Sequence, residues 1–533
     1  MERTAERTGN HAVLVAAGIF LSRIFGLVRQ HFISHYFGLS DPGDAFTQAF
    51  KIPNLLRNLF GEGSLSASFI PVYARLLAEK DEEEAGRVAG AVFALLALAV
   101  SVLVLIGVAA TPYIIDLIAA GFTGAKRELT IRLVRILFIG AGFLVMSAWC
   151  LGILNSHRKF FLSYASPVMW NLAMIVCMVL LGRSAHRDSL AVALAWASVI
   201  GSALTFAVQL PSVLRLVKRL RIHFAYHGDH VPDVVRNFVP VFFSRGVVQI
   251  STYVDLWLAS WLPTGAPTAL YNASLLYLLP VSLFGMSVSD AELPAMSSAL
   301  GAQAEIAGYL RQRLNRGLRQ IAFFVVPSSM GFLALGGVVA AALYQTGRFS
   351  HADAQYVWGI LAGASVGLVA QTLGRLYSST YYALRDTRTP MRYAVVRVCL
   401  TSGLGYLFAL PLPRWLGIDP GWGAAGLTSS AGIAGWVEFS LLRHTLNGRI
   451  GRTGLPASLV ARLWGSAAVA AAAGWAVKLA LGPQGPKISG AAILSAYVVV
   501  YFAATYALRV PECGAMLERA LAQVSRVSRR DAR

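Results

Sequence analysis

The sequence predicts an all-α, polytopic membrane protein of about 14 transmembrane helices, because such apolar runs recur along it and charged residues are scarce. Of its 533 residues, 56% are hydrophobic and 14% are charged, and the mean hydropathy is +0.59. Soluble domains carry about 25% charged residues. The deficit is explained if lipid, and not water, covers most of the surface.

The apolar runs that support this count are each long enough to cross a bilayer, which takes about 20 residues. They cover residues 11–36, 44–77, 86–117, 129–154, 160–182, 189–214, 234–262, 266–299, 318–345, 353–383, 390–411, 420–444, 457–481 and 486–508. The second and eighth runs are the weakest, since both carry polar residues throughout. The first run has no small-residue cleavage site, so we predict an uncleaved first helix.

The distribution of positive charge predicts the orientation. If the N-terminus is cytoplasmic, the basic clusters at 215–221 and 311–319 both fall on the cytoplasmic side, as the positive-inside rule requires. An even number of helices then leaves both termini in the cytoplasm. The net charge of +20 does not indicate nucleic acid, because the basic residues sit in short clusters between apolar runs and form no zinc-finger or basic-aromatic pattern.

An internal repeat indicates duplicated halves. Matching features recur at an offset of 222 or 223 positions: Ser22-Arg23 with Ser244-Arg245, Pro71 with Pro294, and Pro167 with Pro390. We therefore predict two pseudo-repeated six-helix lobes, at 1–220 and 221–450, followed by two helices at 451–510 and a basic cytoplasmic tail at 511–533. Such duplication around a midplane site is a common transporter design.

The second apolar run carries a polar stripe. Its polar residues step by three and four along a helix and so share one face: Asp44, Thr47, Gln48, Lys51, Asn54 and Asn58. Pro53 and the Gly61/Gly63 pair should bend or loosen this helix. The stripe either lines a water-filled cavity or lies in the membrane interface; we favour the cavity because the neighbouring first helix adds two arginines.

Ionisable groups in spanning helices are costly, about 2.5–3.5 kcal/mol each on insertion scales, and mark functional sites. The first two helices hold Arg23, Arg29, Lys51 and Arg57. Arginine offers a planar fork suited to phosphate, and lysine offers a point charge. We therefore predict a cavity that binds a phosphate-bearing or otherwise acidic substrate.

Other intramembrane charges fit two interpretations. These charges either form ion pairs within the bundle or contact a substrate or coupling ion. They are Asp255, Arg375, Arg397 and Glu438. Arg245 differs from them because it occupies the repeat position of Arg23. We find no nucleotide-binding, metalloprotease or serine-hydrolase motif, so we predict neither an enzyme nor a metal or cofactor site. Transport would then depend on a sodium or proton gradient, the membrane potential or substrate supply.

Two segments resemble a known family. SRIFGLVRQHFISHYFG and then DAFTQAFKIPNLLRNLFGEGSLSASFIPVYA are similar to the N-terminal signature of the MurJ (MviN) lipid II flippases. LNSHRKFFLSYASPVMWN and LRDTRTPMR resemble the segments that follow helices 4 and 10 in that family. The resemblance covers nearly the whole chain and implies the fold of the multidrug/oligosaccharidyl-lipid/polysaccharide exporter superfamily, with helices 13 and 14 forming a groove for a lipid tail.

The resemblance also implies a cargo and roles. The cargo is lipid II, an undecaprenyl-diphosphate disaccharide-peptide, carried across the bacterial plasma membrane for peptidoglycan synthesis. Substrate-binding roles fall on Arg23, Arg29, Arg57, Lys51, Asn54 and Arg245, and gating or ion-pairing roles on Asp44, Glu62 and Asp255. Membrane lipids and cell-wall synthesis proteins are the other expected partners.

The sequence departs from the family pattern at one cavity position. The acidic–arginine pair expected early in helix 8 is replaced by Ser274 and Leu275, and we hypothesise that Arg245 supplies the missing cation. The alternatives are a flippase for another polyprenyl-diphosphate-linked glycan, an ion-coupled small-molecule antiporter, and a membrane scaffold for cell-wall enzymes.

Overall fold

The computed structural model describes residues 2–217, 230–298, 302–482, 484–516 and 518, and omits the side chains of 2–17, 19, 62–63, 66, 243–248 and 250–251. Within these ranges the chain is helical and contains no strand. Each of the 14 predicted apolar runs coincides with helix. Among the described residues, ten helices are long and apolar enough to span a membrane. The all-α, polytopic membrane fold is thus confirmed.

The chain forms two compact units, Met1–Thr268 with Thr346–Phe349, and Ala269–Gln345 with Ser350–Arg533. The first contains α1 (Glu2–Phe37), α2 (Asp41–Lys51), α3 (Asn54–Phe60), α4 (Glu62–Ala78), α5 (Glu82–Ile118), α6 (Gly124–Ser156), α7 (Phe160–Ala165), α8 (Pro167–Leu181), α9 (Arg187–Leu216) and α10 (Val231–Ser260). This grouping places α10, the predicted seventh helix, with the N-terminal helices. The predicted lobes, divided at residue 220, are the parts expected to move relative to each other during transport. The compact units do not test this division, which stays a prediction.

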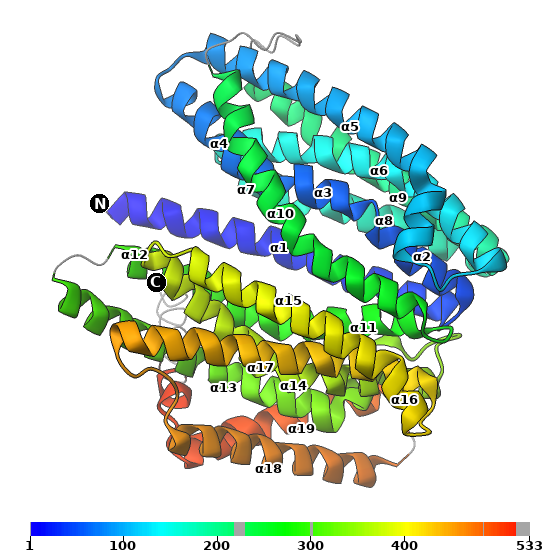
Figure 1. Cartoon of the computed structure of the whole chain (residues 1–533), viewed down its shortest axis with the longest axis vertical. Helices are drawn as coiled ribbons and strands as arrows, with labels where there is room; N and C mark the ends of the chain where they lie inside the picture. Colours follow the sequence, from blue (N-terminus) through cyan, green and yellow to red (C-terminus); the bar gives the residue numbers. More distant parts are fainter. Residues whose placement is uncertain (1, 218–229, 299–301, 483, 517, 519–533) are drawn as a thin grey trace, which may run out of the picture. The chain divides into compact units, whose positions relative to one another are not determined.

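In the first unit α6 is central and packs against α2, α4, α5 and α9, while α8 packs against α1 and α9 (Figure 1). Trp149 of α6 is fully buried and donates from Nε1 to the Ala89 carbonyl oxygen of α5 at 3.1 Å. Large side chains on the outer faces are exposed, such as Leu105 at 69% and Leu180 at 71%. Exposed apolar faces on spanning helices are the surfaces that lipid covers.

The predicted weakness of the second run is confirmed as two breaks. Ile52 and Pro53 separate α2 from α3, because proline has no N–H to donate and its ring clashes with the preceding turn. Gly61 then separates α3 from α4, and its N–H donates to the Arg57 carbonyl oxygen at 2.8 Å. Three short helices therefore replace one continuous span.

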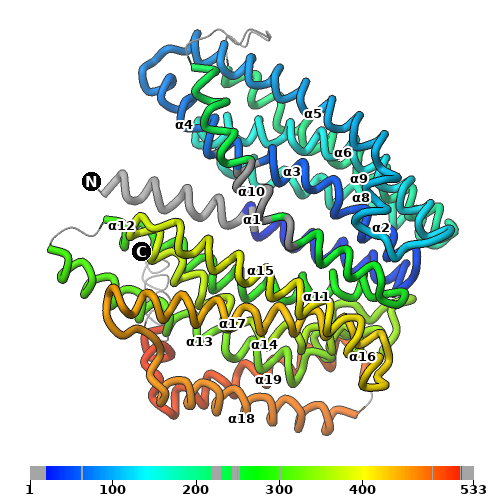
Figure 2. Tube along the Cα trace, in the orientation of Figure 1, coloured from blue at the N-terminus to red at the C-terminus, as the bar shows by residue number. Residues whose placement is uncertain are grey.

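The second unit holds the remaining helices. They are α11 (Ala266–Pro280), which begins in the first unit, η1 (Val281–Met286), α12 (Ser287–Ser297), α13 (Gln303–Tyr344), α14 (His351–Ala383), α15 (Arg388–Ala409), α16 (Pro411–Trp415), η2 (Pro420–Trp422), α17 (Gly423–Ile450), α18 (Ala457–Leu481) and α19 (Pro486–Ala507). The α14 helix packs on α13 and α17, and α18 and α19 lie side by side against α13 (Figure 2). A β-carbon on Gly367 of α14 would lie 2.4 Å from Gly432 Cα of α17, so small residues set this close helix contact.

Several helices end in the same turn, closed by a basic residue in the left-handed region. After α4, α6, α14 and α19 the residues with positive φ are Lys80, Arg158, Arg385 and Arg509. In each turn the N–H of the following residue donates five residues back, as Lys159 N–H does to the Leu154 carbonyl oxygen at 2.8 Å. This is the Schellman arrangement, in which glycine is the usual residue.

Candidate functional site

Arg29 is the buried cation of the first helix. Its side chain is 6% exposed, and its Nη1 donates to Asn171 Oδ1 of α8 at 3.0 Å. Its Cζ lies 5.1 Å from the centre of the Phe50 ring and 5.4 Å from that of Trp170, within the range of a cation–π contact. Helices α1, α2 and α8 therefore combine to orient one guanidinium group.

The two rings beneath Arg29 are themselves fixed. Phe50 and Trp170 stack with centroids 5.1 Å apart and planes 7° apart, and Trp170 Nε1 donates to Ser198 Oγ of α9 at 2.9 Å. A β-carbon on Gly201 of α9 would lie 2.8 Å from Trp170 Cα, so the glycine permits α9 to approach α8 this closely. The aromatic pair is thus a rigid platform for cations.

Arg57 of α3 reaches the same platform. Its Cζ lies 5.8 Å from the Trp170 ring centroid, and the residue is half-buried. Two guanidinium groups on one indole repel each other, and an anion between them would be held by charge-assisted, bidentate hydrogen bonds. The structure thus brings together Arg29 and Arg57, two of the four arginines predicted to bind the substrate. Arg23, by contrast, is exposed. It forms none of the ion pairs or ring contacts found among the described residues.

Asp44, at the start of the polar stripe, is fully buried in a polar network. Its carboxylate accepts from the Gly265 N–H at 2.7 Å, from the Thr268 N–H at 3.1 Å and from Thr268 Oγ1 at 2.7 Å. Lys126 Nζ of α6 lies 2.8 Å from the same carboxylate. These contacts tie α2 to α6 and to the segment that joins α10 and α11.

Lys126 also pairs with Asp41, one turn earlier on α2, at 2.9 Å. Asp41 accepts a further hydrogen bond from Thr264 Oγ1 at 2.8 Å, but its side chain is 55% exposed. One ammonium group therefore bridges a buried carboxylate and an exposed one. Water screens the exposed pair, whereas loss of one partner from the buried pair would leave an uncompensated buried charge.

The rest of the stripe faces α10. Gln48 Nε2 donates to the Leu256 carbonyl oxygen at 2.8 Å, and Lys51 interacts electrostatically with Asp255. Asn58 Nδ2 donates to Gln249 Oε1 at 3.3 Å, also on α10. Asn54 turns back and donates to the Phe50 carbonyl oxygen of its own segment at 2.8 Å. The stripe is therefore largely packed against protein here, with Asn58 exposed.

Two predicted residues, Glu62 and Arg245, have side chains outside the described part of the chain, so their roles stay predictions. In the second unit, Arg397 Nε and Glu438 Oε2 lie 3.2 Å apart, which matches the ion-pairing interpretation of these two charges.

Sequence reasoning did not assign roles to Trp170, Asn171 or Lys126. Asn171 carried a usable signal, since it is a polar residue on an otherwise apolar helix. Lys126 lies at the end of a span, where a cation is common and does not by itself indicate a functional role.

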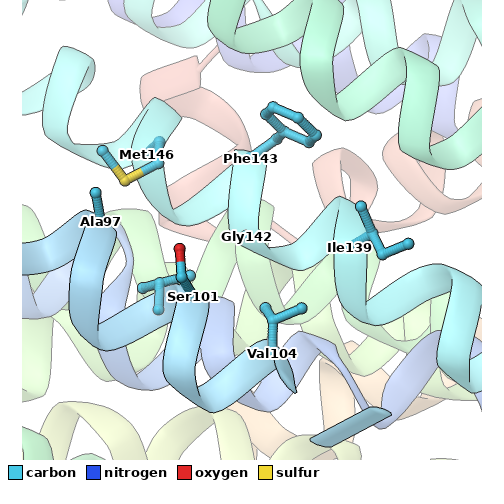
Figure 3. Close-up of a pocket in the computed structure, with 8 residues that line it drawn as sticks. Ala97, Ser101, Val104, Ile139, Gly142, Phe143 and Met146 are labelled. Atoms are coloured by element: carbon cyan, nitrogen blue, oxygen red, sulfur yellow. The ribbon is translucent and has the colours of Figure 1, made fainter. Parts of the chain in front are cut away.

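A separate pocket of about 240 Å³ lies between α5 and α6. Val104, Ile139, Phe143 and Met146 line it, with the Ser101 hydroxyl as the one side-chain polar group drawn there (Figure 3). Because no charged residue lines it, this pocket suits an acyl chain and not an anion.

The family model described as "Lipid II flippase MurJ" matches residues 33–502. The lipid II flippase MurJ of Burkholderia cenocepacia is 31% identical over 441 residues, covering 81% of this chain and 82% of that protein. The probable lipid II flippase MurJ of Bdellovibrio bacteriovorus is 32% identical, over 82% and 81% of the two chains.

Two solved structures share the fold. One, titled "Lipid II flippase MurJ, inward closed conformation", superposes with a TM-score of 0.76 at 24% identity and covers 93% of this chain and 98% of that chain. An inward-facing multidrug resistance MATE transporter of the MOP superfamily superposes with a TM-score of 0.63 at 15% identity, over 82% of this chain and 98% of that chain.

Proposed function

The chain belongs to the MurJ lipid II flippase family, and on that premise we propose that it moves lipid II from the inner to the outer leaflet of the bacterial plasma membrane. The observation that carries the mechanism is the pair Arg29 and Arg57 on the Trp170 indole. A lipid-linked diphosphate offers acceptor oxygens for both guanidinium forks. A flippase for another polyprenyl-diphosphate glycan would use the same cations, but the relatives favour lipid II.

The fixed platform explains why arginine is needed at these positions. The stacked Phe50–Trp170 pair and the Asn171 amide hold the Arg29 guanidinium in place before a substrate arrives. A preorganised group loses little conformational entropy on binding. The headgroup would therefore be bound by positioned charge, while the lipid tail stays in the membrane along α18 and α19.

The Asp44 network supplies the gate in this proposal. It joins α2 and α6 to residues 264–268, where α10 passes into α11. Alternating access requires such contacts at one membrane surface to form and break as the headgroup passes. Lys51, at the other end of α2, interacts electrostatically with Asp255 of α10, and this interaction would weaken in the same motion.

The turns at the helix ends support the proposed orientation. With the N-terminus in the cytoplasm, the helices that end at Lys80, Arg158, Arg385 and Arg509 all end at the cytoplasmic surface. Cations at that surface follow the positive-inside rule. Both termini would then be cytoplasmic.

The proposal includes no catalytic step, since flipping makes and breaks no covalent bond. Its energy source would be a sodium or proton gradient or the membrane potential. Moving one charge across 100 mV is worth about 2.3 kcal/mol, so an anionic headgroup would couple transport to the potential. Cell-wall synthesis proteins that make or consume lipid II are the expected partners.

Complementation tests the proposal in a bacterium whose own lipid II flippase can be switched off. We expect the wild-type chain to restore growth and Arg29→Ala and Arg57→Ala to fail at equal membrane abundance. Conservative Arg29→Lys should restore growth partly, because charge remains without the fork. Rescue by a double Arg29→Ala, Arg57→Ala variant would refute the cationic site, and lipid II flux into proteoliposomes separates loss of transport from host incompatibility.

A further inference from the structure

A second cavity lies where α6 and α9 end, away from the cluster on Trp170. It has a volume of about 580 Å³ and is formed by the end of α6, the turn into α7 and the last turn of α9. Three cations line it, Arg158, Lys159 and Arg215, together with the Ser212 hydroxyl. All three cationic residues are exposed. The proposed transport step does not use any of them.

The cations are available to a ligand. None of the ion pairs formed by described residues involves Arg158, Lys159 or Arg215. The C-terminal ends of α6 and α9 oppose an anion, since each carries about half a negative charge. Three full positive charges outweigh these two half charges. The net field in the cavity therefore favours an anion.

The cavity is also amphipathic. Phe161 is 46% exposed and, with Leu216, forms an apolar wall beside the cations. Since α6 and α9 are both long enough to span the bilayer, their ends lie at a membrane surface, where lipid headgroups meet acyl chains. Basic pockets between transmembrane helices at such surfaces bind anionic lipid headgroups. A soluble anion would gain nothing from the apolar wall.

We infer that this cavity binds the phosphate of an anionic phospholipid, with Arg158, Lys159 and Arg215 around the phosphate and Phe161 and Leu216 against the start of an acyl chain. Ser212 provides a neutral donor for one phosphate oxygen. The site goes beyond the proposed transport of lipid II and does not depend on it. It would hold the ends of α6 and α9 to one leaflet while other helices move.

The backbone conformation at Arg158 allows its positive charge to be removed without disturbing the turn. Its φ is 60°, in the left-handed region that asparagine also adopts readily. Arg158→Asn therefore removes the cation and keeps the turn. Arg509→Asn is the matched control, because Arg509 has a φ of 52° at the end of α19 and does not line the cavity.

The experiment uses the full-length chain in nanodiscs of phosphatidylcholine with a minor fraction of phosphatidylglycerol, and native mass spectrometry measures the lipid that stays bound. We expect wild type to retain phosphatidylglycerol in preference to phosphatidylcholine. Each cation near an anionic headgroup changes affinity about fivefold, so Arg158→Asn should lower affinity for phosphatidylglycerol about fivefold. The triple variant with Lys159→Gln and Arg215→Gln should lower it about a hundredfold. Arg509→Asn should leave retention unchanged.

Three results would overturn the inference. Equal losses in Arg158→Asn and Arg509→Asn would mean that diffuse surface charge, and not this cavity, attracts the lipid. Displacement of phosphatidylglycerol by inorganic phosphate at matched concentration would mean that the apolar wall is irrelevant. When undecaprenyl diphosphate is added to the same nanodiscs, its retention in preference to phosphatidylglycerol would assign the cavity to the cargo. If the triple variant does not fold, the single variants decide the outcome, and lipid II flux measured alongside keeps this result separate from the transport proposal.

Discussion

The Asp44 network allows a prediction whose size follows from its geometry. Asp44→Ala removes the acceptor of two backbone N–H groups, those of Gly265 and Thr268, at 2.7 and 3.1 Å. A buried donor left without an acceptor costs about 1–3 kcal/mol, so two cost about 2–6 kcal/mol. Because Asp41 beside them is exposed, water can enter and the lower part of that range, about 2–4 kcal/mol, applies.

Hydrogen exchange measures this loss directly. The N–H groups of Gly265 and Thr268 exchange when the segment opens locally, and the exchange rate rises tenfold for each 1.4 kcal/mol lost. We expect Asp44→Ala to speed exchange in residues 262–270 by about 30- to 700-fold. The assay is hydrogen–deuterium exchange with mass spectrometry on the protein in nanodiscs.

Asp41→Ala is the matched control, because it removes the other carboxylate that pairs with Lys126 on the same helix. Its side chain is 55% exposed, and an exposed ion pair is worth at most about 1 kcal/mol. Exchange should then rise no more than about fivefold. The reasoning is refuted if the two variants behave alike, or if Asp44→Ala leaves exchange within a factor of about three of wild type.

Further predictions concern the cations, one turn and one helix contact. Arg29→Lys keeps the charge but loses the fork and the stacking, so lipid II flux into proteoliposomes should fall about tenfold, whereas Arg23→Lys at an exposed site should change it little. Asp386 lies in the turn before α15, where a backbone hydrogen bond from Thr389 lowers the pKa of its carboxyl group to about 2. The ionised carboxylate therefore stabilises the folded protein fully above about pH 4, and this stabilisation is lost as the pH falls through about 2. In Asp386→Asn the melting temperature should no longer change between these two pH values because of this group. A melting temperature that depends on pH as strongly as in wild type would contradict the prediction. Gly201→Ala should lower the melting temperature by forcing α8 from α9, whereas Gly403→Ala, with nothing within 4 Å, should not.

The sequence predicted most of the fold because the signals for membrane helices are local. Apolar runs located the long helices of the described residues, although not the short α16, and Pro53 and Gly61 predicted where the second run breaks. These features depend only on side-chain hydropathy and on backbone chemistry at single residues. Neither needs knowledge of what a helix packs against.

The candidate site was predicted only in part, because a single sequence does not show which residues of distant helices contact each other. Arg29 and Arg57 were identified as cations, but their shared contact with Trp170 depends on how α8 packs against α1 and α9. The contrast between Arg23 and Arg29 could have been anticipated. Six residues along a helix turn the side chain through about 600°, so the two arginines point about 120° apart and cannot share one site on a straight helix.

The turns with positive φ show how a charge at a helix end can offset a local preference for glycine. A side chain in the left-handed region costs about 1–2 kcal/mol, and a pattern-based expectation would place glycine there. Lys80, Arg158, Arg385 and Arg509 occupy such positions instead. A cation at a helix C-terminus gains about 0.3–1 kcal/mol from the helix dipole. This gain offsets part of the strain, so a basic residue can close a helix in a turn where glycine is the usual residue.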